Sequence, residues 1–141
     1  MKILMIILAC TVFVVSERAS ADSGGTISYL VAVDDEGSSV AAGFKFNSVA
    51  SMAYRHQLEP TTDIERSKGL YLRLTAPIHN TYQPYVIAGY ARFKHRGDHV
   101  DKGQLGFGLD YKLNSNISIY SEFIELVGDT NRLSLGARLQ F

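Results

Sequence analysis

Strict alternation of side-chain type constrains this chain most. From Gln104 to Leu113 every odd position is large and apolar, and every even position is small or polar. Residues 132–141 repeat the pattern, with Leu133, Leu135, Ala137, Leu139 and Phe141 on one side. Period two puts neighbouring side chains on opposite faces of a β-strand. No segment after residue 21 has a helical period long enough to predict a helix, so we expect an all-β chain.

Six more segments read as strands, which brings the expected total to eight. They are residues 26–33, 39–47, 49–58, 68–76, 83–94 and 116–126. Short turns rich in Asn, Ser and Pro follow the second, fourth and sixth strands, whereas longer polar segments such as 95–101 follow the others. This alternation predicts an up-and-down meander with short turns at one end and longer loops at the other.

The two faces of these strands differ in chemistry. One is mainly Ala, Val, Ile, Leu, Met, Phe and Tyr, and its only formal charge is Glu125. The other is rich in Gly, Ala and Ser and carries ten charged residues: Lys45, Arg55, Arg73, Arg92, Lys94, Asp110, Lys112, Glu122, Arg132 and Arg138. Small and charged residues suit the narrow lumen of an eight-stranded barrel, and the apolar face suits lipid.

We therefore predict a closed antiparallel eight-stranded transmembrane β-barrel, present as a monomer. Closure is required because hydrocarbon offers no hydrogen-bond partner to a free sheet edge. The strand lengths match the ~9–11 residues of a tilted membrane-spanning strand. A soluble, lipocalin-like periplasmic carrier with the apolar face inside is the alternative that the alternation leaves open.

The N-terminus has the features of a secretory signal peptide, expected over residues 1–21. Lys2 is followed by a 13-residue apolar run and by the small residues Ala19-Ser20-Ala21. A lipoprotein signal at Cys10 is the weaker alternative, because the apolar run continues past it. The barrel domain then spans 22–141 and holds no cysteine for a disulfide. The whole chain has 14 basic and 14 acidic residues, so there is no basic excess to favour a nucleic-acid partner.

Two groups of residues are candidate structural sites. Lumen charges predict a salt-bridge network that fills the barrel rather than an ion gate, and its members are Arg73, Arg92, Asp110, Glu122 and Arg138. Aromatic residues near strand ends predict girdles at the two membrane interfaces. Those expected at the short-turn end are Tyr29, Phe46, Tyr85, Tyr111 and Phe141, and those at the loop end are Tyr54, Phe93 and Phe123.

Catalysis, a metal site and a cofactor are not expected. Two loops combine the residue types that a hydrolase needs, namely His56 with Glu65 and Ser67, and His95 with Asp98 and His99. Neither matches a catalytic motif of lipid-A-modifying enzymes. The spacing of His95 and His99 suits a metal only on a helix. The acidic run 34–36 is interpreted as a solvated turn, with binding of a divalent cation as the alternative.

The C-terminal segment Gly136-Ala137-Arg138-Leu139-Gln140-Phe141, together with the expected signal and meander, resembles the small eight-stranded outer-membrane barrels of Gram-negative bacteria, of the OmpA/OmpX and opacity-protein type. The resemblance implies an outer-membrane location among lipid and lipopolysaccharide. It also implies that Gly136, Leu139 and Phe141 belong to a signal read by the barrel-assembly machinery. We expect a structural or surface-interacting role, without an open pore or catalysis. A lipid-A-modifying enzyme is the alternative, and the short loops argue against long-loop adhesion.

Overall fold

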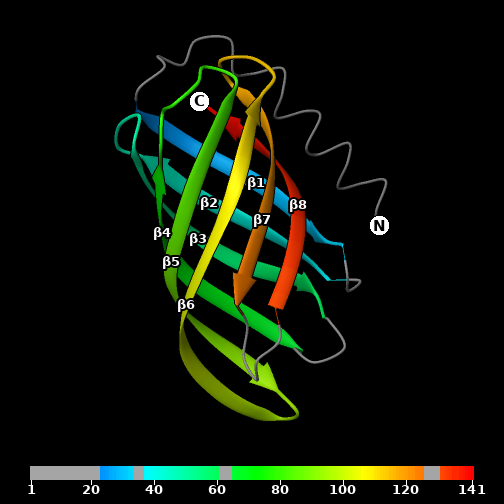
Figure 1. Cartoon of the computed structure of the whole chain (residues 1–141). Helices are drawn as coiled ribbons and strands as arrows, with labels where there is room; N and C mark the ends of the chain where they lie inside the picture. The colour runs from blue at the N-terminus through cyan, green and yellow to red at the C-terminus, as the bar shows by residue number, and fades with distance from the viewer. Residues whose placement is uncertain (1–22, 34–36, 61–64, 126–130) are drawn as a thin grey trace.

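The chain folds into a closed barrel of eight antiparallel strands (Figure 1). The computed structural model describes residues 23–33, 37–60, 65–125 and 131–141. The strands are β1 (Gly24–Ala32), β2 (Ser38–Lys45), β3 (Ala50–Glu59), β4 (Arg66–Thr75), β5 (Tyr82–His95), β6 (Asp98–Lys112), β7 (Ile117–Glu125) and β8 (Asn131–Gln140). The expected signal peptide and the acidic run 34–36 lie outside the described residues. Within those residues no helix is long and apolar enough to cross a membrane.

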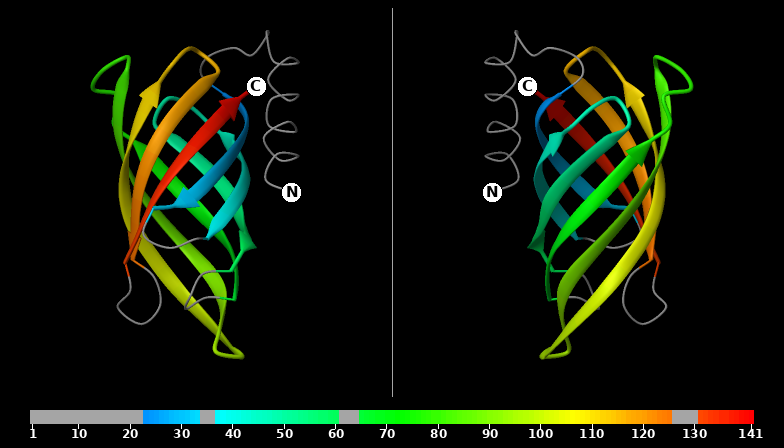
Figure 2. Two further views of the ribbon diagram at one scale, coloured as in Figure 1. Left: turned by 90° about the vertical axis from the view of Figure 1, so that its right-hand side faces the viewer. Right: turned by 90° about the vertical axis from the view of Figure 1, so that its left-hand side faces the viewer.

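Each strand pairs with the next along the chain, and β8 pairs with β1 to close the sheet. The predicted meander is therefore confirmed. Asparagine side chains shape two of the short turns, because Asn47 Oδ1 accepts hydrogen bonds from the amides of Val49 and Ala50. Asn114 Oδ1 does the same in the turn between β6 and β7. The strands run obliquely around the barrel (Figure 2), as closure of a twisted sheet requires.

The connection between β5 and β6 differs from the prediction. Residues 95–101 were expected to form a longer loop, but β5 continues to His95 and β6 begins at Asp98. Arg96 and Gly97 alone make the turn, with φ of 50° and 88°. Two consecutive residues with positive φ form the tight turn whose twist matches that of the flanking strands. The resulting hairpin of 14 and 15 residues projects beyond the rest of the barrel, at the end opposite the C-terminus (Figure 1).

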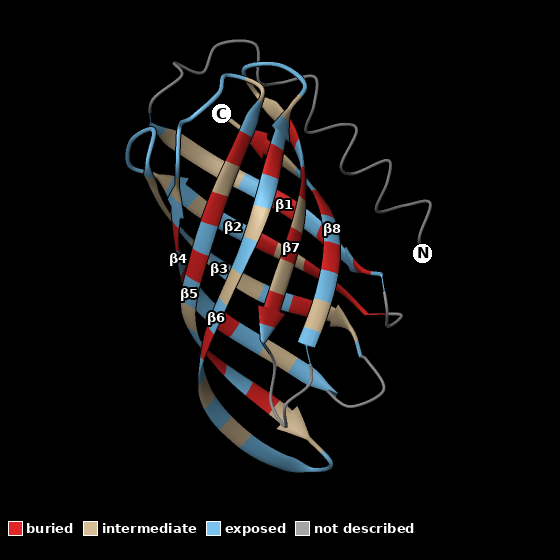
Figure 3. Ribbon diagram, in the orientation of Figure 1, coloured by how far each residue is buried: buried red, intermediate tan, exposed pale blue. Residues whose placement is uncertain are grey.

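The apolar face points outward on seven of the eight strands, as predicted. Leu105 and Phe107 on β6 are 69% and 61% exposed, and exposed apolar side chains recur on every strand of the wall. Buried and exposed residues alternate along the strands (Figure 3). The outer surface is therefore mainly apolar, which is the arrangement expected when the solvent is hydrocarbon.

Strand β5 is the exception, because its two faces are inverted relative to the prediction. Tyr85 and Phe93, expected outside, are 3% and 1% exposed, whereas Arg92, expected inside, is exposed. The neighbouring strands explain this. Gly108 lies opposite Tyr85, and a Cβ on Gly108 would meet the Tyr85 ring at 2.4 Å. The small residues of β6 therefore make room for the large inward side chains of β5.

Candidate functional site: the barrel lumen and its two ends

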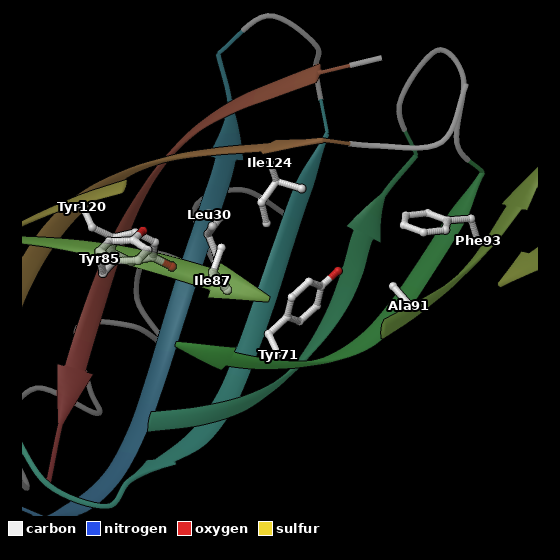
Figure 4. Packing of buried hydrophobic residues seen from close by; sticks show 8 residues of the cluster. All are labelled: Leu30, Tyr71, Tyr85, Ile87, Ala91, Phe93, Tyr120 and Ile124. Carbon is white, nitrogen blue, oxygen red and sulfur yellow. The ribbon is translucent and has the colours of Figure 1, made fainter. Parts of the chain in front are cut away.

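The lumen is filled by large side chains. The buried apolar cluster consists of Leu30, Tyr71, Tyr85, Ile87, Ala91, Phe93, Tyr120 and Ile124. Figure 4 shows Tyr85 from β5 beside Tyr120 from β7, and their ring centroids are 6.4 Å apart. Two internal voids have volumes of about 20 and 30 Å³. A buried water needs roughly 10–15 Å³, so each void has room for one or two waters.

One charge cluster of the lumen joins β3, β4, β5 and β7. Arg55 Nη1 lies 2.7 Å from Glu122 Oε1, and the two side chains are only 17% and 2% exposed. Tyr85 Oη donates a hydrogen bond to the other carboxylate oxygen of Glu122 at 3.1 Å. The guanidinium of Arg55 lies 4.7 Å from the centroid of the Tyr71 ring. Glu122 was predicted for this network, whereas Arg55 was assigned to the lumen but not to the site.

A second cluster joins β4, β6 and β8. Asp110 Oδ2 accepts hydrogen bonds from Arg73 Nη2 and, at 2.9 Å, from Arg138 Nη1. Arg73 stacks on the Tyr85 ring at 3.6 Å and Arg138 on the Tyr120 ring at 4.3 Å. Arginine–aromatic stacking of this kind stabilises a guanidinium that has lost its water. The structure thus brings together four of the five predicted network residues, divided between the two clusters.

Arg92, the fifth, does not belong to the lumen. It lies on the outer face of the projecting hairpin and binds Asp101 through two hydrogen bonds of 2.6 and 2.8 Å. Nearby, Lys94 Nζ lies 2.8 Å from Glu65 Oε2. This hydrogen bond lowers the pKa of the Glu65 carboxyl below its usual value. The hydrophobic pattern of β5 did not reveal this placement, because both faces of that strand contain apolar residues.

The predicted girdle residues divide into two groups. The outward side chains are Tyr29, Phe46, Tyr54, Tyr111, Phe123 and Phe141. Tyr85 and Phe93 line the lumen, so their assignment to the girdle is wrong. Four exposed aromatics that were not predicted extend the outer set, namely Phe44, Tyr82, Tyr90 and Phe107. The ring of Tyr82 contacts that of Tyr111, with centroids 5.1 Å apart.

The C-terminal segment completes the barrel seam. Gly136 lies opposite Tyr120, and a Cβ there would meet the Tyr120 ring at 2.6 Å. Leu139 is buried, and the amide of Phe141 donates to the carbonyl of Gly25 at 3.0 Å. The pairing with β1 therefore continues to the last residue. Recognition of this segment by the assembly machinery stays a prediction.

The candidate histidines do not converge on a site. Side chains of paired residues share a face of the sheet, and His95 pairs with Asp98 whereas His99 pairs with Lys94. The two histidines therefore lie on opposite faces of the hairpin. His56 faces outward, while Ser67 lines an internal void. Within the described ranges, no group of three metal-ligating side chains gathers.

Comparisons with known proteins support the architecture. No family model and no curated protein matches the chain. The N-terminal β-barrel domain of Pseudomonas aeruginosa OprF is 15% identical, with a TM-score of 0.62 over 87% of this chain and 100% of that one. The fold is that of a small outer-membrane barrel. The same fold occurs in the de novo designed barrel TMB2.3, at 12% identity and a TM-score of 0.61 over 89% and 98% of the two chains.

A third match is the Yersinia pestis outer-membrane protein Ail in a phospholipid bilayer nanodisc. It is 15% identical, with a TM-score of 0.52 over 86% of this chain and 100% of that one. At these identities the likeness concerns the fold. A designed barrel with the same architecture shows that the fold alone does not determine a role, which has to be argued from the residues of this chain.

Proposed function

We propose that this protein is a monomeric outer-membrane barrel that does not conduct solutes, does not catalyse a reaction, and acts through its loop-end surface. The filled lumen is the observation that carries the proposal. Arg55 with Glu122 and Arg73 with Asp110 cross the interior between strands, and four tyrosine and phenylalanine side chains occupy the space around them. An interior closed in this way leaves the outer surface for interaction.

We call the interacting surface the basic extension. It consists of residues 65–68, at the start of β4, and residues 92–102 of the β5–β6 hairpin. It contains six Lys or Arg residues and three Asp or Glu residues. Arg66, Lys68 and Arg96 are exposed. A basic surface beyond an apolar belt suits anionic headgroups, so we assign the phosphate groups of lipopolysaccharide as its partner.

Conductance and lipid binding test the two parts of the proposal. Planar bilayers containing the refolded chain are expected to show no stable channel, and reproducible unitary currents would refute the closed lumen. Lipid A added to nanodiscs is expected to raise the unfolding temperature of the protein, because a ligand that binds only the folded state stabilises it.

The lipid A effect is expected to shrink in the double variant Arg66→Gln, Arg96→Asn. Asparagine suits the positive φ of position 96, so this variant keeps the turn. Arg132→Gln, which removes one charge on the lumen side of β8 and lies outside the basic extension, is the control. An equal loss in the control would place lipid A elsewhere.

Mass spectrometry of lipid A from cells that express the protein tests for catalysis. An altered acyl pattern would overturn the proposal that the protein does not catalyse a reaction.

A further inference from the structure

The short-turn end of the lumen opens into a vestibule with an excess of positive charge. This short-turn vestibule is a cavity of about 50 Å³ whose charged lining consists of Lys45, Arg73, Asp110, Lys112 and Arg138. The four cations come from β2, β4, β6 and β8, each at or two residues before the end of its strand. Alternate strands thus direct one base each toward the same mouth.

The acid in the vestibule does not balance these bases. Among the described residues that line it, Asp110 is the only acid, and its Oδ2 already accepts from both Arg73 and Arg138. Lys45 Nζ lies 3.5 Å from the neutral side-chain oxygen of Gln140. Among the described residues, the lining therefore carries three more positive than negative charges.

Two buried polar atoms of the vestibule lining have no hydrogen-bond partner among the described residues. Arg73, whose side chain is 8% exposed, leaves Nη1 without an acceptor, and Asp110 leaves Oδ1 without a donor. Buried polar atoms are normally paired, and an exception points to a missing water or ligand. Gln83, Ser51 and Ser118 add further hydrogen-bonding groups to the same lining.

We infer that the short-turn vestibule binds a phosphate group. Guanidinium and ammonium groups together form the usual recognition set for phosphate oxygens. A protonated phosphate also supplies an O–H for Asp110 Oδ1 while its other oxygens accept from Arg73 Nη1 and the lysines. Inorganic phosphate has this chemistry, and the headgroup of phosphatidylglycerol combines phosphate oxygens with hydroxyl donors. Both are therefore candidate sources of the group.

Calorimetric titration of the full-length protein with inorganic phosphate, in a phosphate-free maltoside detergent, tests the inference. We expect saturable binding that weakens about tenfold in Lys112→Gln, the loss of one charge-assisted hydrogen bond. Arg132→Gln removes one positive charge toward the far end of the barrel, outside both the vestibule lining and the basic extension, and is expected to bind like the wild type. A gel-mobility change on boiling confirms that each variant is folded, and Lys45→Gln replaces Lys112→Gln if the latter does not fold.

Phosphatidylglycerol added to the same micelles separates the two sources. Displacement of inorganic phosphate identifies the lipid headgroup as the occupant in a membrane, and undisturbed binding identifies the free ion. Absence of saturable binding, or an equal loss in the Arg132 and Lys112 variants, would overturn the inference. Neither result depends on the loop-end surface, so this site and the proposed function can fail separately.

Discussion

Removing the charge of Glu122 is the most informative test of the filled lumen. Glu122→Gln keeps the size of the side chain and an oxygen that accepts from Tyr85, but it leaves the Arg55 guanidinium without its counter-charge. Breaking a buried ion pair by removing one partner costs ~3–5 kcal/mol. Arg55 is 17% exposed and retains some contact with water, so we expect the lower end, about 3 kcal/mol.

Arg55→Met, and its combination with Glu122→Gln, measure the interaction energy between Arg55 and Glu122. Arg55→Met leaves the 2%-exposed carboxylate of Glu122 without its counter-charge. We expect this variant to lower the free energy of unfolding by about 4–5 kcal/mol. Combining the two changes removes both charges, so the double variant is expected to be much more stable than the sum of the single effects predicts. Urea unfolding of the barrel in lipid vesicles, followed by gel mobility, measures each free energy of unfolding.

Asp101→Asn is the matched control, because it breaks an ion pair on the exposed hairpin, where water compensates the loss. We expect its free energy of unfolding to stay close to that of the wild type. A Glu122→Gln protein as stable as the control, or single effects that simply add in the double variant, would show that the lumen charges are solvated. The closed-lumen argument would then be wrong.

Three further outcomes are expected. Leu109→Arg places a charge on the lipid-facing wall and should destabilise the barrel in vesicles by ~2–4 kcal/mol, and an unchanged urea midpoint would mean that this face does not meet hydrocarbon. Gly106→Ala should unfold at a lower urea concentration than Gly103→Ala. A Cβ at position 106 would meet the Phe123 carbonyl oxygen at 2.4 Å, whereas a Cβ at position 103 would meet only the Gly89 carbonyl oxygen at 3.9 Å. The pKa of the Glu65 carboxyl is lowered from its usual value of 4.5. The stabilising contact with Lys94 is therefore complete above pH 4.5 and is lost as the pH falls through the lowered pKa. An NMR titration that gives the usual pKa for Glu65 would contradict this.

The sequence by itself determined the fold class and most of the facing. In β6 and β8 one face is apolar and the other small or polar, so a shift by one residue would exchange the entire apolar set. Such strands have one acceptable orientation, and the alternation identified it. The same reasoning assigned Asp110 and Glu122 to the lumen, where the structure places both.

Tertiary structure decided what the alternation left ambiguous. Strand β5 has apolar residues on both faces, so its orientation follows from its neighbours, where Gly106 and Gly108 leave space for Ile87 and Tyr85. Which arginine meets which carboxylate was likewise undetermined, because the partners come from different strands and meet only when the barrel closes. Side-chain periodicity is a property of one strand, whereas the filling of a lumen depends on the volumes and charges that all eight strands bring to it.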